Sequence, residues 1–190
     1  LMINIDDVKL RLEKVLSKSR FIHSINVMNV SVDLAKRYGV DSGRAAVAGL
    51  LHDCAKDIKD EKAFEFCMEL DINIDPIQRN QPSLLHGPIG AGLARKEYGV
   101  IDREILSSIY YHTTGHENMT LLEKIVLISD SIEPDRSFPD VEEMREKAFE
   151  DIDKAVLLSL NRKLSRIILK GQVIHPNTVN ARNFIVLNEI

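Results

Sequence analysis

Apolar residues recur at three- and four-residue spacing along this 190-residue chain, and no segment alternates apolar and polar residues between hairpin turns. That period belongs to amphipathic helices, so the sequence predicts an all-α fold. Leu, Ile, Val and Ala supply most of the 44% hydrophobic content. Glu and Lys lie between these residues at helical spacing, which favours helix further. We expect about eight or nine helices in a single domain spanning residues 1–190, because a chain of this length buries one core.

Capping residues set the expected helix ends. Gly39 is typical of a helix C-terminus, and Thr120 begins a capping-box pattern at a helix N-terminus. The segment 71–84 contains two prolines, and we expect it to be an irregular loop that borders a site. The expected helices cover residues 6–17, 19–39, 42–56, 61–70, 86–98, 102–112, 120–131, 141–170 and 178–187.

Charge and cysteine usage restrict the partners and the location. A net charge of −4 argues against nucleic-acid binding, although bound metal ions can supply the positive charge that a nucleotide needs. Cys54 and Cys67 form no CxxC pair, and we expect both to be buried thiols in a reducing compartment. Residues 1–7 are too polar for a signal peptide, and no apolar run approaches the ~18 residues of a membrane span. We therefore expect a soluble cytoplasmic protein with no membrane partner.

Several ionisable residues lie on the apolar faces of these expected helices. His23 shares a face with Val27, His112 shares one with Ile109, and Asp130 follows an apolar run in its helix. An unpartnered buried charge costs several kcal/mol by order of magnitude, so inward-pointing imidazoles and carboxylates require a reason. A divalent cation is the simplest one, because it satisfies all of them together.

The alternative is that each histidine is an ordinary hydrogen-bonded core residue, which is the more frequent case for any one of them. The adjacent pair His52-Asp53 favours a metal site for the set. We expect this pair in the middle of a helix, where neighbouring residues point about 100° apart. Both side chains then reach one ion only if the helix passes close beside it, and the small residues Ala48 and Gly49 would allow that approach.

The order of His23, the dyad His52-Asp53 and the late Asp130 resembles the HD superfamily of metal-dependent phosphohydrolases, with the string 48–56 (AGLLHDCAK) as the more specific motif. Further motifs are similar to those of the YqeK family, the bacterial symmetrical bis(5'-nucleosyl)-tetraphosphatases. These are LLHG at 84–87, YHTTG at 111–115, ISDSIEPDR at 128–136, and Phe138-Pro139. We expect residues 20–139 to form the core of one HD domain and residues 140–190 to form its C-terminal helices.

The resemblance implies two divalent metal ions, often iron in this family, although imidazole and carboxylate ligands also suit manganese, cobalt or zinc. Cys54 stands where the family often has an aromatic residue, which would alter the pocket wall, and Ser129 stands where it commonly has Ala. The implied ligands are His23, His52, Asp53 and Asp130 for the first ion and His86 and His112 for the second, with Asp53 bridging both.

Two ions ~3.5–4 Å apart can deprotonate a bridging water near neutral pH, and this hydroxide would attack a phosphorus atom. The resemblance implies cleavage of diadenosine tetraphosphate into two ADP molecules. Asp53 and Lys56 are the candidate catalytic residues. The candidate phosphate-binding residues are Arg20, Lys56, Arg136 and Thr113, for each of which a surface role is the alternative.

Two rival functions remain open at this point. One is an HD phosphohydrolase that acts on nucleoside tri- or monophosphates, alarmones or cyclic dinucleotides, and the other is a non-enzymatic nucleotide-binding regulator. The oligomeric state is open as well, with a homodimer through the C-terminal helices as one alternative. We expect His116 in an exposed turn outside the metal shell and His175 in a surface loop.

Overall fold

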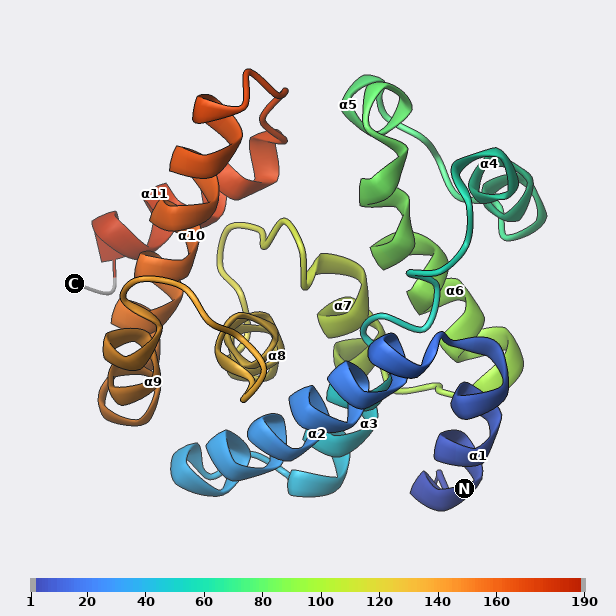
Figure 1. Cartoon of the computed structure of the whole chain (residues 1–190), viewed down its shortest axis with the longest axis horizontal. Coiled ribbons are helices and arrows are strands. Elements are labelled where there is room, and N and C mark those ends of the chain that lie inside the picture. Colours follow the sequence, from blue (N-terminus) through green and yellow to red (C-terminus); the bar gives the residue numbers. More distant parts are fainter. Residues whose placement is uncertain (1–2, 189–190) are drawn as a thin grey trace.

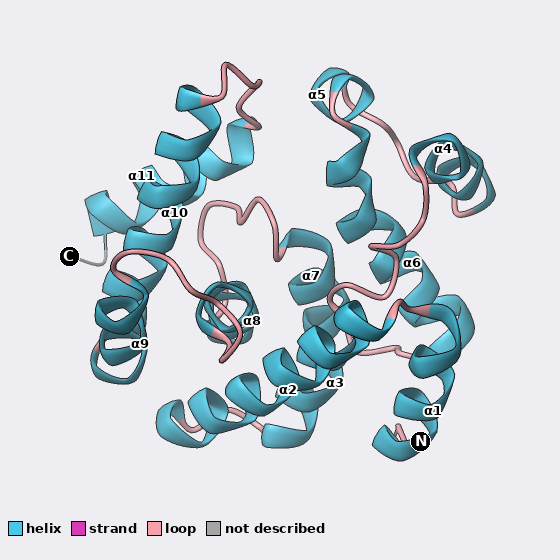
Figure 2. Ribbon diagram, viewed as in Figure 1, coloured by secondary structure: helices cyan, strands magenta, loops and turns pink. Residues whose placement is uncertain are grey.

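A computed structural model describes residues 3–188 (Figure 1). This range holds eleven α-helices, one short 3₁₀-helix and no strand (Figure 2), so the all-α prediction is confirmed and the number of helices is larger than expected. Residues 1–2 and 189–190, which the domain prediction includes, lie outside the described range. The helices are α1 (Ile5–Val15), α2 (Lys18–Tyr38), α3 (Ser42–Leu51), α4 (Asp60–Glu69), α5 (Pro76–Asn80), η1 (Pro82–Leu85), α6 (His86–Tyr98), α7 (Arg103–Tyr111), α8 (Leu121–Ile132), α9 (Val141–Glu150), α10 (Ile152–Leu169) and α11 (Pro176–Asn188).

The segment 71–84 is more ordered than we expected. It contains α5 and begins the 3₁₀-helix η1. Asp75 caps α5 by accepting hydrogen bonds from the backbone of Ile77 and Gln78, and the Gln78 side chain completes a capping box. Proline at the start of each short helix costs no hydrogen bond there, so the residues that suggested a loop begin helices instead.

The long helix expected over 141–170 is wrong as one element. Asp151 adopts an extended backbone conformation (φ −150°, ψ 101°) between α9 and α10. Its side chain accepts hydrogen bonds from the backbone of Asp153 and Lys154, which makes it the N-cap of α10. A capping aspartate inside a run of charged residues is hard to distinguish in sequence from a solvated helix position.

Helices α2, α3, α7 and α8 form the middle of the molecule, with α2 packed on α3 and α8 and α7 packed on α6 and α8 (Figure 1). The C-terminal helices α9–α11 lie on one side of this group and α4–α6 on the other. Fully buried side chains such as Leu34, Leu50 and Ile128 fill the core. None of the described helices combines the length and the apolar character needed to cross a membrane.

Candidate metal centre

The six residues predicted to bind metal come together in the middle of the molecule. Five have buried side chains, and the Asp130 side chain is 24% exposed. They lie in five separate segments, so the centre depends on the packing of helices that are far apart in the chain. These segments are α2 (His23), the turn after α3 (His52, Asp53), the start of α6 (His86), the end of α7 (His112) and α8 (Asp130).

The dyad does not lie in the middle of a helix. Helix α3 ends at Leu51, and the chain continues in tight turns, with the Cys54 amide bonded to the Leu51 carbonyl (3.1 Å) and the Lys56 amide bonded to the Asp53 carbonyl (2.9 Å). The expected helix 42–56 is therefore too long. His52 keeps helical backbone angles (φ −53°, ψ −39°) as the C-cap of α3, and both side chains of the dyad reach the same centre from this turn.

Three histidines are oriented by the same kind of hydrogen bond. Nδ1 of His52, His86 and His112 each lies against the backbone carbonyl three residues earlier, at 2.7 Å for His52 and 2.8 Å for His112. A carbonyl oxygen only accepts, so each Nδ1 donates its proton, and in the neutral form of each ring Nε2 is the unprotonated nitrogen that faces the centre. This is the tautomer that a metal-binding imidazole requires.

The Nε2 atoms meet in two pairs, His23 with His52 at 3.2 Å and His86 with His112 at 3.0 Å. Two lone pairs facing each other at that distance repel unless a metal ion or a proton lies between them. Two nitrogen ligands at right angles on one ion, each ~2.1 Å from it, are about 3.0 Å apart. The spacing of both pairs therefore fits metal coordination.

Asp53 lies between these two pairs. Its Oδ1 is 3.3 Å from Nε2 of both His86 and His112, and its Oδ2 is 3.5 Å from His52 and 3.7 Å from His23. Oδ1 is buried and has no hydrogen-bond partner among the described residues. One carboxylate oxygen thus faces each histidine pair, which is the arrangement of a bridging ligand, and the donor set fits two cations.

Asp130 and Glu133 complete the side of the centre formed by α8. Asp130 Oδ1 is 3.1 Å from His23 Nε2, and His23, His52 and Asp130 form one group whose ligand atoms lie within 4.8 Å of one another. Glu133 Oε1 is 3.1 Å from Nδ1 on the other side of the His23 ring. Glu133 orients His23 as the backbone carbonyls orient the other rings, a role that its place in the motif 128–136 did not reveal.

The electrostatics favour bound cations. Burial opposes ionisation of Asp53, yet the imidazoles around it hold the pKa of its carboxyl well below the usual range. Burial lowers the pKa of His112 to about 4, which leaves its ring neutral at neutral pH. Burial also lowers the pKa of the Lys56 ammonium. The Asp53 carboxylate is thus ionised and the His112 ring neutral, the states in which both bind a metal ion.

The two arginines predicted to bind phosphate contact the two carboxylates of the centre. Arg20 donates to Asp53 Oδ2 at 2.6 Å, and Arg136 donates to Asp130 Oδ1 at 2.6 Å and to the Asp130 backbone carbonyl at 2.8 Å. Neither is an isolated surface charge. Their side chains are 28% and 39% exposed, so they lie at the edge of the buried centre.

Lys56 and Thr113 lie beside the second histidine pair. Lys56 Nζ is 3.1 Å from His86 Nε2, and Thr113 Oγ1 is 3.0 Å from Nε2 of both His86 and His112. Lys163, which the sequence did not single out, donates to the Thr113 backbone carbonyl from α10. Nothing in the local sequence separates Lys163 from the other lysines of an amphipathic helix, so only the packing of α10 reveals it.

The two remaining histidines lie outside the centre. His116 lies outside the metal shell, as predicted, but it is less exposed than we expected: its side chain is 26% exposed, and its Nε2 is 3.0 Å from Glu123 Oε2. His175 is not a free surface-loop residue. Its ring is 2.9 Å from the Asp75 carboxylate and only 10% exposed, so it joins the start of α11 to the cap of α5.

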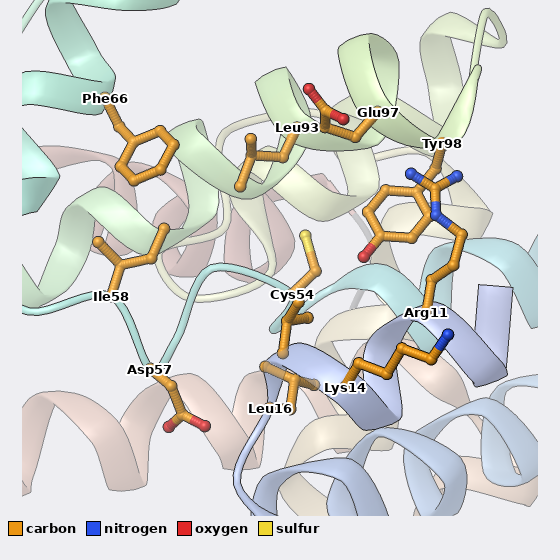
Figure 3. Close-up of a pocket in the computed structure, with 11 residues that line it drawn as sticks. Arg11, Lys14, Leu16, Cys54, Asp57, Ile58, Phe66, Leu93, Glu97 and Tyr98 are labelled. Atoms are coloured by element: carbon orange, nitrogen blue, oxygen red, sulfur yellow. The ribbon is translucent and has the colours of Figure 1, made fainter.

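Cys54 and Asp130 line two different cavities. Cys54 lines one of about 540 Å³, with its thiol on the side of Leu93 and Tyr98 (Figure 3). Burial raises the pKa of the Cys54 thiol to about 12, so it stays protonated. Cys54 does not line the cavity that opens beside Asp130, and its effect on the wall of a substrate pocket stays a prediction.

The other cavity, of about 450 Å³, opens beside Asp130, and we call it the basic cavity because four of its side chains are cationic. It lies between the end of α8, the following loop and one face of α10. Its lining residues are Asp130, Ser131, Asp135, Arg136, Ser137, Phe138, Met144, Ser159, Arg162, Lys163 and Arg166.

The HD domain profile matches residues 20–135, which include all six residues of the centre. The chain belongs to the HD domain family. It is 38% identical over 171 residues to the symmetrical bis(5'-nucleosyl)-tetraphosphatase of Bacillus subtilis, covering 90% of this chain and 91% of that protein. It is 32% identical to the Staphylococcus aureus enzyme of the same name, over 95% of this chain and 94% of the relative.

A solved structure has the same fold. The crystal structure of a predicted HD superfamily hydrolase involved in NAD metabolism from Clostridium acetobutylicum superposes with a TM-score of 0.95, at 40% identity and full coverage of both chains. The two tetraphosphatase relatives match 90% and 95% of this chain, so the resemblance seen in short motifs extends over most of its length.

Proposed function

We propose that this HD-family protein is a metal-dependent phosphohydrolase that cleaves diadenosine tetraphosphate symmetrically into two ADP molecules. The observation that carries the proposal is the Asp53 carboxylate, whose two oxygens each face the Nε2 atoms of a pair of histidines. The curated relatives named as symmetrical tetraphosphatases support the choice of substrate, because they match nearly the whole chain. We also propose that residues 136–190 belong to the same domain as the matched segment.

Two divalent ions fit the donors of this centre. His23, His52, Asp53 and Asp130 would hold one ion, and His86, His112 and the second Asp53 oxygen would hold the other. When bound, such a pair of ions neutralises phosphoryl charge and acidifies a water molecule. Iron is the metal that the resemblance favours, and manganese, cobalt and zinc suit the same donors.

The other side chains of the centre would bind and orient the polyphosphate. Arg20 and Arg136 present guanidinium groups at the two carboxylates, where each can donate to phosphoryl oxygens. Lys56 brings a partly desolvated ammonium to the His86 side, and Thr113 adds a hydroxyl there. Together they would hold the reacting phosphorus between the two halves of the centre.

Chromatographic analysis of products tests this proposal. The protein is incubated anaerobically with diadenosine tetraphosphate and, in parallel, with ATP, AMP and a cyclic dinucleotide. We expect ADP as the sole product of the first reaction and little turnover of the others. AMP plus ATP as products, or faster turnover of ATP, would assign the protein to another HD activity.

Two aspartate variants make the test specific to the centre. Asp53→Asn should lower the rate at least about 100-fold, because losses of that size follow even from removing groups behind a metal ligand. Asp33→Asn removes a carboxylate on the exposed side of α2, whose only close partner within residues 3–188 is Lys36, and should leave the rate unchanged. Equal rates for both variants would refute the metal mechanism.

A further inference from the structure

The cationic wall of the basic cavity comes from α10. Arg162, Lys163 and Arg166 line the cavity from this helix, and Asp130 lines it from the metal centre. The match to the HD domain profile ends at residue 135, so this wall lies outside the matched segment. The cavity therefore joins a common metal centre to a feature of the C-terminal helices.

These three cations have no acidic partner within ion-pair distance among residues 3–188. The two carboxylates of the cavity are engaged elsewhere, because Asp130 contacts His23 and Arg136. Asp135 accepts a hydrogen bond from Asn26 at 3.0 Å. In a chain with a net charge of −4, an uncompensated cluster beside a phosphohydrolase centre is a candidate anion site.

Two of these side chains are held in place. Lys163 donates to the backbone carbonyl of Thr113, the residue after His112, and is only partly exposed. The Arg162 guanidinium stacks on the Phe138 ring, 3.9 Å from its centroid. A cation fixed before the ligand arrives loses less conformational entropy on binding. This gives Phe138, for which the sequence offered no function, a role in positioning Arg162.

We propose that α10 forms a half-site for one nucleoside diphosphate of the substrate, with Lys163 and Arg166 on its phosphates and Arg162 positioned beside them by Phe138. This inference rests on the proposed hydrolysis of a dinucleoside tetraphosphate. Water adds to one of the two inner phosphorus atoms, and the bond from that phosphorus to the bridging oxygen at the middle of the chain breaks. The bridging oxygen departs with the ADP in the half-site, and the oxygen from water stays on the other ADP.

The half-site explains how a shared metal centre selects its substrate. A nucleoside monophosphate reaches the metal centre with its single phosphate and leaves the α10 wall without a partner. A dinucleoside tetraphosphate extends beyond the reacting phosphorus with a second diphosphate, which brings negative charge to that wall. Binding energy gained there positions the reacting bond, so α10 acts on substrate choice as well as on affinity.

The test is the affinity for ADP, measured by titration calorimetry on the full chain with a fixed excess of Mn²⁺. Lys163→Met removes one charged donor and should weaken ADP binding about 10- to 100-fold, and Arg166→Gln, at a more exposed position, should weaken it about two- to fivefold. Lys154→Met is the matched control, since Lys154 lies on the same helix in an exposed ion pair with Asp151. It should bind ADP like the parent protein.

Two further measurements separate the possible outcomes. Lys163→Met should lose more affinity for ADP than for AMP, and its urea midpoint should match that of the parent protein. A merely structural role of Lys163 would produce neither result. ADP affinity within twofold of the parent protein in both cavity variants, or no ADP binding by the parent protein, would overturn the half-site. Failure to hydrolyse diadenosine tetraphosphate while the variants still lose ADP affinity would instead refute the proposed function alone.

Discussion

Gly49 allows α3 to pass close enough to α2 for the centre to form. A Cβ atom at this position would lie 2.7 Å from Ser31 Oγ, 3.1 Å from Ser31 Cβ and 3.0 Å from Met28 Cα. Ordinary carbon–carbon contacts are ~3.5–4.0 Å, so Gly49→Ala must move the two helices apart by about 0.5 Å. Helix α2 carries His23 and α3 leads into His52, so the change reaches the metal centre as well.

The expected loss of stability is the difference of two effects. Overpacking a buried contact costs about 1–3 kcal/mol, and the contact with the Met28 backbone places Gly49→Ala near the upper end. Replacing Gly by Ala inside a helix returns about 1 kcal/mol through the better helix propensity of Ala. We expect Gly49→Ala to lower the free energy of unfolding by about 1–2 kcal/mol.

Gly90→Ala is the matched control, because it makes the same substitution in a buried helix where the atoms nearest to a new Cβ are 3.4–3.6 Å away. Only the helix-propensity effect applies there, so stability should stay the same or rise by up to about 1 kcal/mol. Urea denaturation of both variants measures the difference. Equal stability of the two would refute the close-approach argument, as would unchanged affinity of Gly49→Ala for Mn²⁺ together with a parent-like urea midpoint.

Three further predictions concern residues outside the predicted ligand set. Glu133→Gln removes the charge behind His23 and should weaken Mn²⁺ binding about 10- to 100-fold by calorimetry; unchanged binding would exclude an orienting role. Glu123 raises the pKa of His116, so the stabilisation by protonated His116 is complete below the unfolded pKa of ~6.5 and disappears as pH rises through the higher folded value. His116→Gln should therefore cost about 1 kcal/mol in urea denaturation at pH 5.5 and little at pH 9, and equal costs would contradict the ion pair. Asp151→Ala should lower the urea-derived free energy of unfolding by about 1 kcal/mol through loss of the α10 N-cap, whereas a parent-like value would deny that role.

Local patterns in the sequence predicted the fold well wherever the capping chemistry was visible. The capping box of Thr120 and Glu123 begins α8 as predicted, and Gly39 ends α2 with a left-handed backbone (φ 72°). The break at Asp151 was missed, because a capping aspartate in a charged segment resembles a solvated position. The end of α3 at Leu51 was missed because the apolar pattern continues across it.

The sequence likewise predicted some residues of the candidate site and missed others. The six residues predicted to bind metal lie close together, because ionisable side chains on apolar faces need a shared partner once they are buried, and the family motifs point to the same positions. That they bind metal stays a prediction. Glu133 lies inside a quoted motif, yet its contact with His23 depends on how α2 crosses α8. Lys163 has no distinguishing signal at all, since the proximity of α10 to Thr113 is a property of tertiary packing.

Stepwise return of metal to chelator-treated protein would test the two-ion account of this centre. Mn²⁺ is added anaerobically while bound metal per chain and the rate of ADP release from diadenosine tetraphosphate are both recorded. The account predicts that the rate reaches its maximum only when about two ions are bound per chain, one for each histidine pair. Full activity with one ion per chain, or ADP release that persists without metal, would contradict it.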